Sequence, residues 1–223
     1  MTGLRNFYFI VISAVAITLQ LLPSSALAQY KPAQSKTYLI NGLVSAIPFI
    51  GYGMANLKKR IGGASLYSYV SPIEGTAIIQ PKIVREIRSL HRQNPRIQIN
   101  LIGISYGASM VTAISAILSR DNIPVNYLGV IDGRPLTKIH SNVRRTDNFT
   151  CSFLDCIGVR LRMARGNNTT HKVSFKFRST HISLGNNVDL HNRVIQQISR
   201  VNYSQLAQPG NTGIDNMPVA SIR

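Results

Sequence analysis

The stretch NLIGISYGAS, residues 100–109, places a serine between two glycines directly after a run of apolar residues. Ser105 is this serine, and Gly103 and Gly107 complete the pattern G-x-S-x-G. Such a turn from strand into helix exposes the serine hydroxyl, and its glycines allow two backbones to pass closely. Ser105 is therefore a candidate nucleophile. The alternative is a tight turn that serves packing alone.

Strand-like and helix-like segments alternate on both sides of this motif. The expected strands cover residues 37–42, 65–70, 96–104, 125–132 and 171–179. The expected helices cover residues 53–61, 78–93, 108–119 and 188–201. Alternation of this kind predicts an α/β fold, with a mostly parallel sheet between helices on both faces, as in a compact three-layer sandwich.

Residues 1–28 read as a segment that is removed from the mature protein. Arg5 precedes an apolar run over residues 7–22, which is short for a membrane anchor, and Ala26-Leu27-Ala28 follows. These features predict a signal peptide and export to a periplasm or the cell exterior. We expect a single domain over residues 29–207 and a flexible tail over 208–223. Within the domain, residues 133–170 are expected to form a cap or loop excursion, either facing substrate or solvated.

In a parallel sheet, sites form beyond the carboxyl ends of the strands. Among the histidines, His181 follows an expected strand and precedes the last helix, which favours it as a catalytic base over His191. Asp132 ends an apolar strand and is the preferred acid partner. If residues 142–151 form a further strand, Asp147 or Asp155 becomes the candidate instead.

The segment LIGISYGAS resembles the nucleophile elbow of the α/β-hydrolase superfamily, and the order serine, acid, histidine, through VIDG and STHISLGNN, is similar as well. The resemblance spans residues 37–201, and the chain looks like a compact member, closer in size to cutinases, small lipases and thioesterase-like proteins than to the larger esterases. It implies an oxyanion hole made by the backbone N–H groups of Tyr106 and Leu43. Asn41 stands where lipases of this kind carry a histidine, which leaves the second donor open.

The chain is strongly basic, with 25 lysines and arginines against 8 acidic residues and a formal net charge of +17. This charge favours contact with an anionic membrane or polysaccharide surface. The basic residues are scattered and show no zinc-finger or RNA-binding signature, so no specific nucleic-acid partner is expected. Cys151 and Cys156 enclose four residues, and in an exported protein they predict a local disulfide. A metal pair would need further Cys or His ligands nearby, so no metal site is expected.

These observations support two hypotheses. The first is an exported serine hydrolase that needs no cofactor and cleaves a small-molecule or lipid ester or thioester, with an acyltransferase as its variant. The second is a non-catalytic basic envelope protein of the same fold that binds an anionic ligand. The sequence specifies neither the acyl chain nor the oligomeric state.

Overall fold

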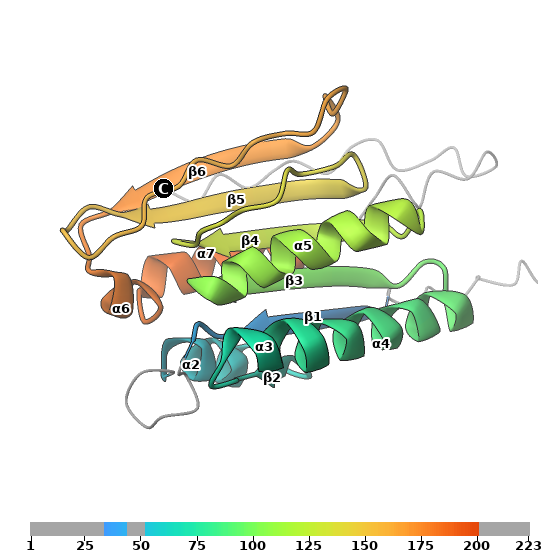
Figure 1. Cartoon of the computed structure of the whole chain (residues 1–223), viewed down its shortest axis with the longest axis horizontal. Coiled ribbons are helices and arrows are strands. Elements are labelled where there is room, and N and C mark those ends of the chain that lie inside the picture. The colour runs from blue at the N-terminus through green and yellow to red at the C-terminus, as the bar shows by residue number, and fades with distance from the viewer. Residues whose placement is uncertain (1–33, 44–51, 201–223) are drawn as a thin grey trace, which may run out of the picture. The chain divides into compact units, whose positions relative to one another are not determined.

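The computed structural model describes residues 34–43 and 52–200, so the predicted signal peptide and C-terminal tail lie outside the described residues. A single sheet of six strands in the order β2-β1-β3-β4-β5-β6 forms its centre, and every pairing is parallel (Figure 1). The strands are β1 (Ser35–Ile40), β2 (Ser65–Tyr67), β3 (Gln98–Ile104), β4 (Val125–Ile131), β5 (Val143–Cys151) and β6 (His171–Phe177). This sheet confirms the predicted α/β class.

Helices cover both faces of the sheet (Figure 1). They are α2 (Tyr52–Arg60), α3 (Pro72–Glu74), the π-helix η2 (Gly75–Ile79), α4 (Gln80–Gln93), α5 (Tyr106–Arg120), α6 (His181–Leu184) and α7 (Val188–Ile198). Helices α4 and α5 pack on one face, whereas α2 and α7 pack on the other. The three layers are those of an α/β-hydrolase-like fold, as predicted.

The alternation of side chains along the strands produces two hydrophobic cores. In β1, Tyr38 and Ile40 point into the core under α4 and α5, and Leu39 between them points into the core under α2 and α7. Strand β4 repeats this pattern, with Leu128 on the first face and Tyr127 on the second. Because strands β3 and β4 are buried on both faces, they read as near-continuous apolar runs in the sequence.

The expectation of a loop excursion over residues 133–170 is wrong for the middle part of this range. Residues 143–151 form β5, which pairs in parallel with β4 and β6 along most of its length. The strand is hard to see in the sequence because several of its buried side chains are polar. Thr146 donates to the carbonyl oxygen of Leu128, and Asp147 accepts from Tyr127 and from a side chain of α7. Because these buried polar side chains find partners elsewhere in the chain, the strand lacks the alternating apolar pattern by which an ordinary strand is identified in a sequence.

Among the described residues, no helix is both long enough and apolar enough to cross a membrane.

Candidate active site

Ser105 lies at the turn between β3 and α5 in a backbone conformation that few side chains adopt. Its φ is 57° and its ψ is −125°, in the region of positive φ that is unfavourable for residues with a Cβ atom. Two hydrogen bonds hold the turn: the Ser105 N–H donates to the carbonyl oxygen of Ile131 at 2.8 Å, and the Ala108 N–H donates to the carbonyl oxygen of Ser105 at 3.0 Å. The strained conformation is what a nucleophile elbow requires.

The two glycines of the motif allow the backbones around this turn to touch. A Cβ atom on Gly103 would lie 2.2 Å from the carbonyl oxygen of Gly107. A Cβ atom on Gly107 would lie 2.3 Å from the carbonyl oxygen of Ile40 and 2.4 Å from that of Asn41. Real Cβ atoms do not approach backbone atoms so closely, so both positions exclude side chains for a steric reason.

Asp132 follows β4 and points its carboxylate into a fully buried cradle. Its side chain is 0% exposed, and its φ of 38° is also positive. Oδ1 accepts from the Gly158 N–H at 2.8 Å, and Oδ2 accepts from the Ile157 N–H at 3.0 Å and from Nδ1 of His181 at 2.7 Å. Burial alone raises the pKa of this carboxyl, but the imidazole and the two amides outweigh it and lower the pKa below its ordinary value.

His181 is the first residue of the short helix α6, and its ring orientation follows from its contact with Asp132. Because an ionised carboxylate can only accept, Nδ1 of His181 carries the proton and donates it to Asp132. Nε2 of the neutral ring is then an acceptor, which is the form of a general base. The His181 side chain is 21% exposed, so the ring is neither sealed in the core nor freely solvated.

Ser105 and His181 line the same cavity, which has a volume of about 140 Å³. Its walls are formed by Asn41, Gly42, Leu43, Ile104, Ser105, His181 and Ile182. Within the part of the chain that the structure describes, no hydrogen bond joins the Ser105 hydroxyl to the imidazole. Such bonds are often long in unliganded hydrolases and tighten in the substrate complex.

Of the two predicted oxyanion donors, one lines this cavity and the other directly follows Ser105 in the chain. Leu43 is part of its wall, and Gly42 approaches Ser105 so closely that a Cβ atom there would lie 3.3 Å from the hydroxyl oxygen. Tyr106 begins α5, and the N–H of a first helical residue has no partner within its own helix. Asn41 is occupied elsewhere, since its side chain donates to the Ser68 hydroxyl at 2.8 Å.

The other candidates named from sequence contact different partners. Asp147 is held by Arg193 at 2.8 Å and by the Tyr127 hydroxyl. His191 is buried, and its Nε2 lies 2.7 Å from the carbonyl oxygen of Gly185. Neither residue lines the cavity. Burial, with a smaller contribution from the charge of Arg60, lowers the pKa of His191 although the contact with Gly185 opposes this shift.

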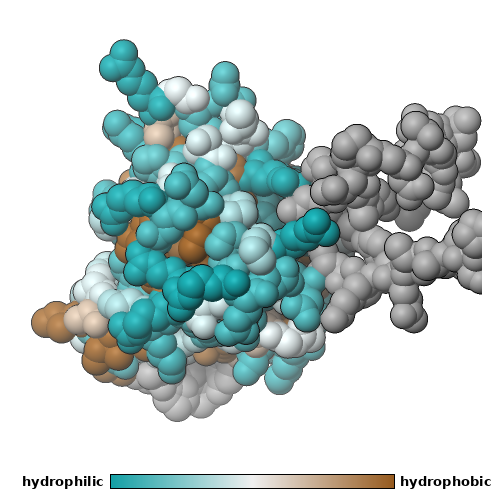
Figure 2. Space-filling view, turned by 90° about the vertical axis from the view of Figure 1, so that its right-hand side faces the viewer, coloured by the Kyte–Doolittle hydropathy of each residue, from teal (hydrophilic) through white to brown (hydrophobic). Residues whose placement is uncertain are grey.

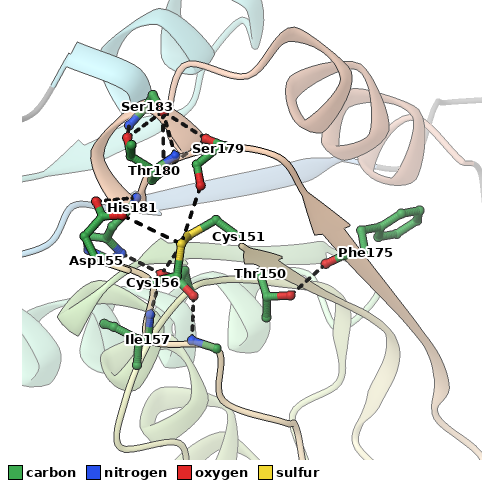
Figure 3. The surroundings of a disulfide bond; sticks show 12 residues. Thr150, Cys151, Asp155, Cys156, Ile157, Phe175, Ser179, Thr180, His181 and Ser183 are labelled. Carbon is green, nitrogen blue, oxygen red and sulfur yellow. Dashed lines mark hydrogen bonds and ion pairs between the residues drawn. A yellow bond between two sulfur atoms is a disulfide. The ribbon is translucent and has the colours of Figure 1, made fainter. Parts of the chain in front are cut away.

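The predicted disulfide between Cys151 and Cys156 is confirmed, with 5.5 Å between the two Cα atoms (Figure 3). Its sulfurs lie near the Asp132 carboxylate, and the three groups have the proximity of a metal site. The two sulfurs are bonded to each other and so supply no thiolate, which argues against metal binding by these three residues.

Sequence reasoning missed the residues that support the Asp132–His181 pair. The amides of Ile157 and Gly158 hold Asp132, and backbone donors leave no mark in a sequence. Asp155, considered above only as an alternative acid, accepts a hydrogen bond from the His181 backbone N–H at 2.8 Å (Figure 3). Its position just after β5 was the signal available for a role near the site.

Comparisons with known proteins give no match to a protein-family model and none to a curated protein. Among solved structures, the chain is similar to the NocB thioesterase domain from the nocardicin cluster, at 10% identity and a TM-score of 0.48, over 76% of this chain and 96% of that one. It is also similar to a cutinase-like protein from Cryptococcus sp., at 15% identity and a TM-score of 0.43, over 76% and 97% of the two chains. An acetyl xylan esterase shares 11% identity at a TM-score of 0.41, over 75% and 98%. These likenesses concern the fold alone.

Proposed function

We propose that the chain is an exported serine hydrolase that cleaves carboxylic ester or thioester bonds through an acyl-enzyme. The observation that carries this proposal is the 2.7 Å contact between Asp132 and His181, whose ring shares a cavity wall with the strained Ser105. A serine hydroxyl needs both exposure and a base before it can attack a carbonyl group. The elbow supplies the first requirement and the paired imidazole supplies the second.

The reaction follows from these positions. Nε2 of His181 takes the proton of the Ser105 hydroxyl as its oxygen attacks the carbonyl carbon of the substrate. The N–H groups of Tyr106 and Leu43 donate to the oxyanion of the tetrahedral intermediate. When the intermediate collapses, the bond to the alcohol or thiol breaks and the leaving group takes the proton from Nε2. A water molecule then repeats the sequence on the acyl-enzyme and releases the acid. An alcohol or amine acceptor in place of water would make the protein an acyltransferase.

Asp132 acts through His181. Its carboxylate holds the ring in the tautomer that leaves Nε2 free, and it stabilises the imidazolium that forms during attack. The two backbone donors and the lowered pKa of Asp132 keep this carboxylate ionised. No metal or organic cofactor enters any step.

The cavity favours a short acyl group. Its volume of about 140 Å³ lies below that of typical pockets for larger ligands, and Leu43, Ile104 and Ile182 give it apolar walls. The disulfide supports export, because such bonds persist in oxidising compartments. The net charge of +17 favours substrates presented at an anionic surface.

A fluorophosphonate probe tests the chemistry directly. We expect it to label the wild-type protein and the Ser119→Ala variant, and to leave Ser105→Ala unlabelled. Ser119 lies near the far end of α5 and is the matched control for a serine on the same helix. A folded wild-type protein that resists the probe would overturn the proposal.

A series of p-nitrophenyl esters tests the substrate class. We expect acetate and butyrate esters to be cleaved with higher kcat/KM than octanoate, and all activity to disappear in Ser105→Ala. The strong positive charge favours a second candidate function, a binding protein for anionic surfaces. In that case, salt-sensitive binding to anionic lipid vesicles would persist in Ser105→Ala and no ester would be cleaved.

A further inference from the structure

The loop closed by the disulfide touches both members of the Asp132–His181 pair. Inside the loop, Oδ2 of Asp155 accepts from the backbone N–H of His181 at 2.8 Å. Directly after the loop, the N–H groups of Ile157 and Gly158 donate to Asp132. Figure 3 shows Asp155 next to His181 and Ile157 on the far side of Cys156. Eight consecutive residues, 151–158, thus reach the acid and the base from one side.

The backbone of His181 needs an external acceptor because of its place in α6. Thr180 caps this helix: its hydroxyl accepts from the Ser183 N–H at 3.1 Å, while the Ser183 hydroxyl accepts from the Thr180 N–H at 3.1 Å. These two bonds satisfy the N–H groups of Thr180 and Ser183, whereas the N–H of His181 has no partner within the helix. The carboxylate of Asp155 fills that position.

The imidazole of His181 is restrained by two contacts, one from Asp132 and one from Asp155, and the first alone would not fix its position. The contact between Nδ1 and Asp132 restrains one edge of the ring, but the ring can still pivot with the short helix that carries it. The bond from Asp155 restrains the backbone at the same residue. Proton transfer requires Nε2 to meet the Ser105 oxygen with sub-ångström accuracy, and misplacement by about 1 Å costs on the order of 100-fold in rate.

The disulfide keeps this second contact in place. Asp155 is exposed and lies on a short loop with Phe153 and Leu154, which are also exposed. Such a loop would not hold a fixed position by packing. The bond between Cys151, at the buried end of β5, and Cys156 ties both ends of the loop to the sheet.

We propose that Asp155 is a positioning residue, which holds the backbone of His181 so that its ring meets Ser105. This inference rests on the proposed hydrolase function. The bond forms through an acceptor oxygen at one point in space, and the negative charge of the carboxylate is secondary. Asp155 does not touch the substrate or the reacting atoms.

Two variants separate the acceptor from the charge. Asp155→Asn keeps an acceptor oxygen at the same reach and removes the charge, whereas Asp155→Glu keeps the charge and moves the acceptor by one methylene. We expect Asp155→Asn to retain kcat within about 3-fold of the wild type and Asp155→Glu to lose about 10-fold. Asp155→Ala, which lacks any acceptor, should lose at least as much as Asp155→Glu. KM should change by less than about 2-fold in all three, because positioning affects proton transfer and not substrate binding.

Ser152→Ala is the matched control, since Ser152 is an exposed residue of the same loop. It should match the wild type in kcat, pH profile and melting temperature. The proposal is overturned if Asp155→Asn is as slow as Asp155→Ala while Asp155→Glu is fast, or if all three variants match Ser152→Ala. The crossed pair of Asn and Glu decides the question even where Asp155→Ala does not fold. Failure of the fluorophosphonate to label the wild-type protein would instead refute the hydrolase function itself.

Discussion

The two ends of strands β3 and β4 hold buried polar side chains, but these side chains are used in different ways. Near the amino ends, Asn100 accepts from Asn126 at 2.9 Å and donates to the Thr37 hydroxyl at 3.2 Å. These groups satisfy one another in ordinary strand geometry. At the carboxyl ends, Ser105 and Asp132 both have positive φ, and Ser105 faces a cavity.

The cavities at the two ends of the strands also differ, both in volume and in the side chains that line them. The cavity at the amino ends of β3, β4 and β5 has a volume of about 290 Å³, twice that of the candidate site, but its lining residues include no histidine and no carboxylate. Figure 2 looks onto this end, where hydrophilic residues surround a smaller hydrophobic area. Cavity size alone therefore does not identify the candidate site.

The two ends of the strands differ in how their buried polar groups affect stability. At the amino ends, polar groups pair with one another and so contribute to stability. At the carboxyl ends, the positive φ of Ser105 and Asp132 strains the backbone and costs stability, and the proposed chemistry accounts for its retention. Substitutions at the carboxyl ends should reduce activity more than stability, and substitutions at the amino ends should do the reverse.

The largest effect is expected for Asp132→Asn. An amide at this position stabilises the wrong tautomer of His181 and no longer compensates the imidazolium, so we expect kcat to fall by about 10⁴-fold. The folded state should survive with some loss of stability, because the amide oxygen still accepts from the Gly158 N–H but the Ile157 N–H then faces the amide NH2. Ester hydrolysis and circular dichroism measure the two effects.

Asp121→Asn is the control for this change. Asp121 lies at the other end of the molecule, just after α5, and forms an exposed ion pair with Arg88 at 2.8 Å. Exposed pairs contribute no more than about 1 kcal/mol, and we expect wild-type activity. If both variants kept full activity, the carboxyl ends would have no special chemical role.

The next largest effect is expected for Gly107→Ala. The added Cβ atom would lie 2.3 Å from the carbonyl oxygen of Ile40, so the start of α5 must move away from β1. Overpacking of this kind costs about 3 kcal/mol, and here it also displaces Ser105. Chemical denaturation and fluorophosphonate labelling should both detect the change. Gly62→Ala, in the turn before β2 at the amino ends, meets no atom within 4 Å and should be neutral.

Asn100→Ala should reduce stability more than activity, the reverse of the changes at the carboxyl ends. The change removes the two buried hydrogen bonds that the Asn100 side chain makes with Thr37 and Asn126, and we expect a loss of about 2 kcal/mol in the free energy of unfolding. The kcat of the folded protein should be unchanged. Thr37→Val should cost less, because Asn100 then keeps its bond with Asn126. A large loss of kcat in Asn100→Ala would mean that the two ends are coupled.

The sequence predicts most of the fold because β3, β4 and the elbow follow local rules. An apolar run, a glycine pattern and a helix start need no knowledge of distant residues. Ser105, Asp132 and His181 all follow strands, so the topology of a parallel sheet suffices to bring them to one edge.

Local rules fail where a residue is supported by a partner far along the chain. From the sequence, a strand over residues 142–151 is only one alternative, because the partner that pairs with its buried Asp147 is Arg193, 46 positions later. The choice between Asp132, Asp147 and Asp155 depends on which oxygen reaches the ring of His181. Only the three-dimensional positions of 132 and 181, 49 residues apart, decide it.

The smallest effect concerns a histidine close to the site that takes no part in it. Burial lowers the pKa of His191 below its ordinary value of 6.5, so the folded state binds a proton less readily than the unfolded state. Stability is then constant above about pH 6.5 and falls as the pH drops below it, because the unfolded chain gains a proton first. We expect chemical denaturation between about pH 5 and pH 7 to show a steeper loss of stability in the wild type than in His191→Gln. Ester hydrolysis at pH 7 should be the same in both proteins, which separates His191 from His181. Equal slopes of stability against pH in the two proteins would show that the buried ring of His191 does not contribute to this pH dependence.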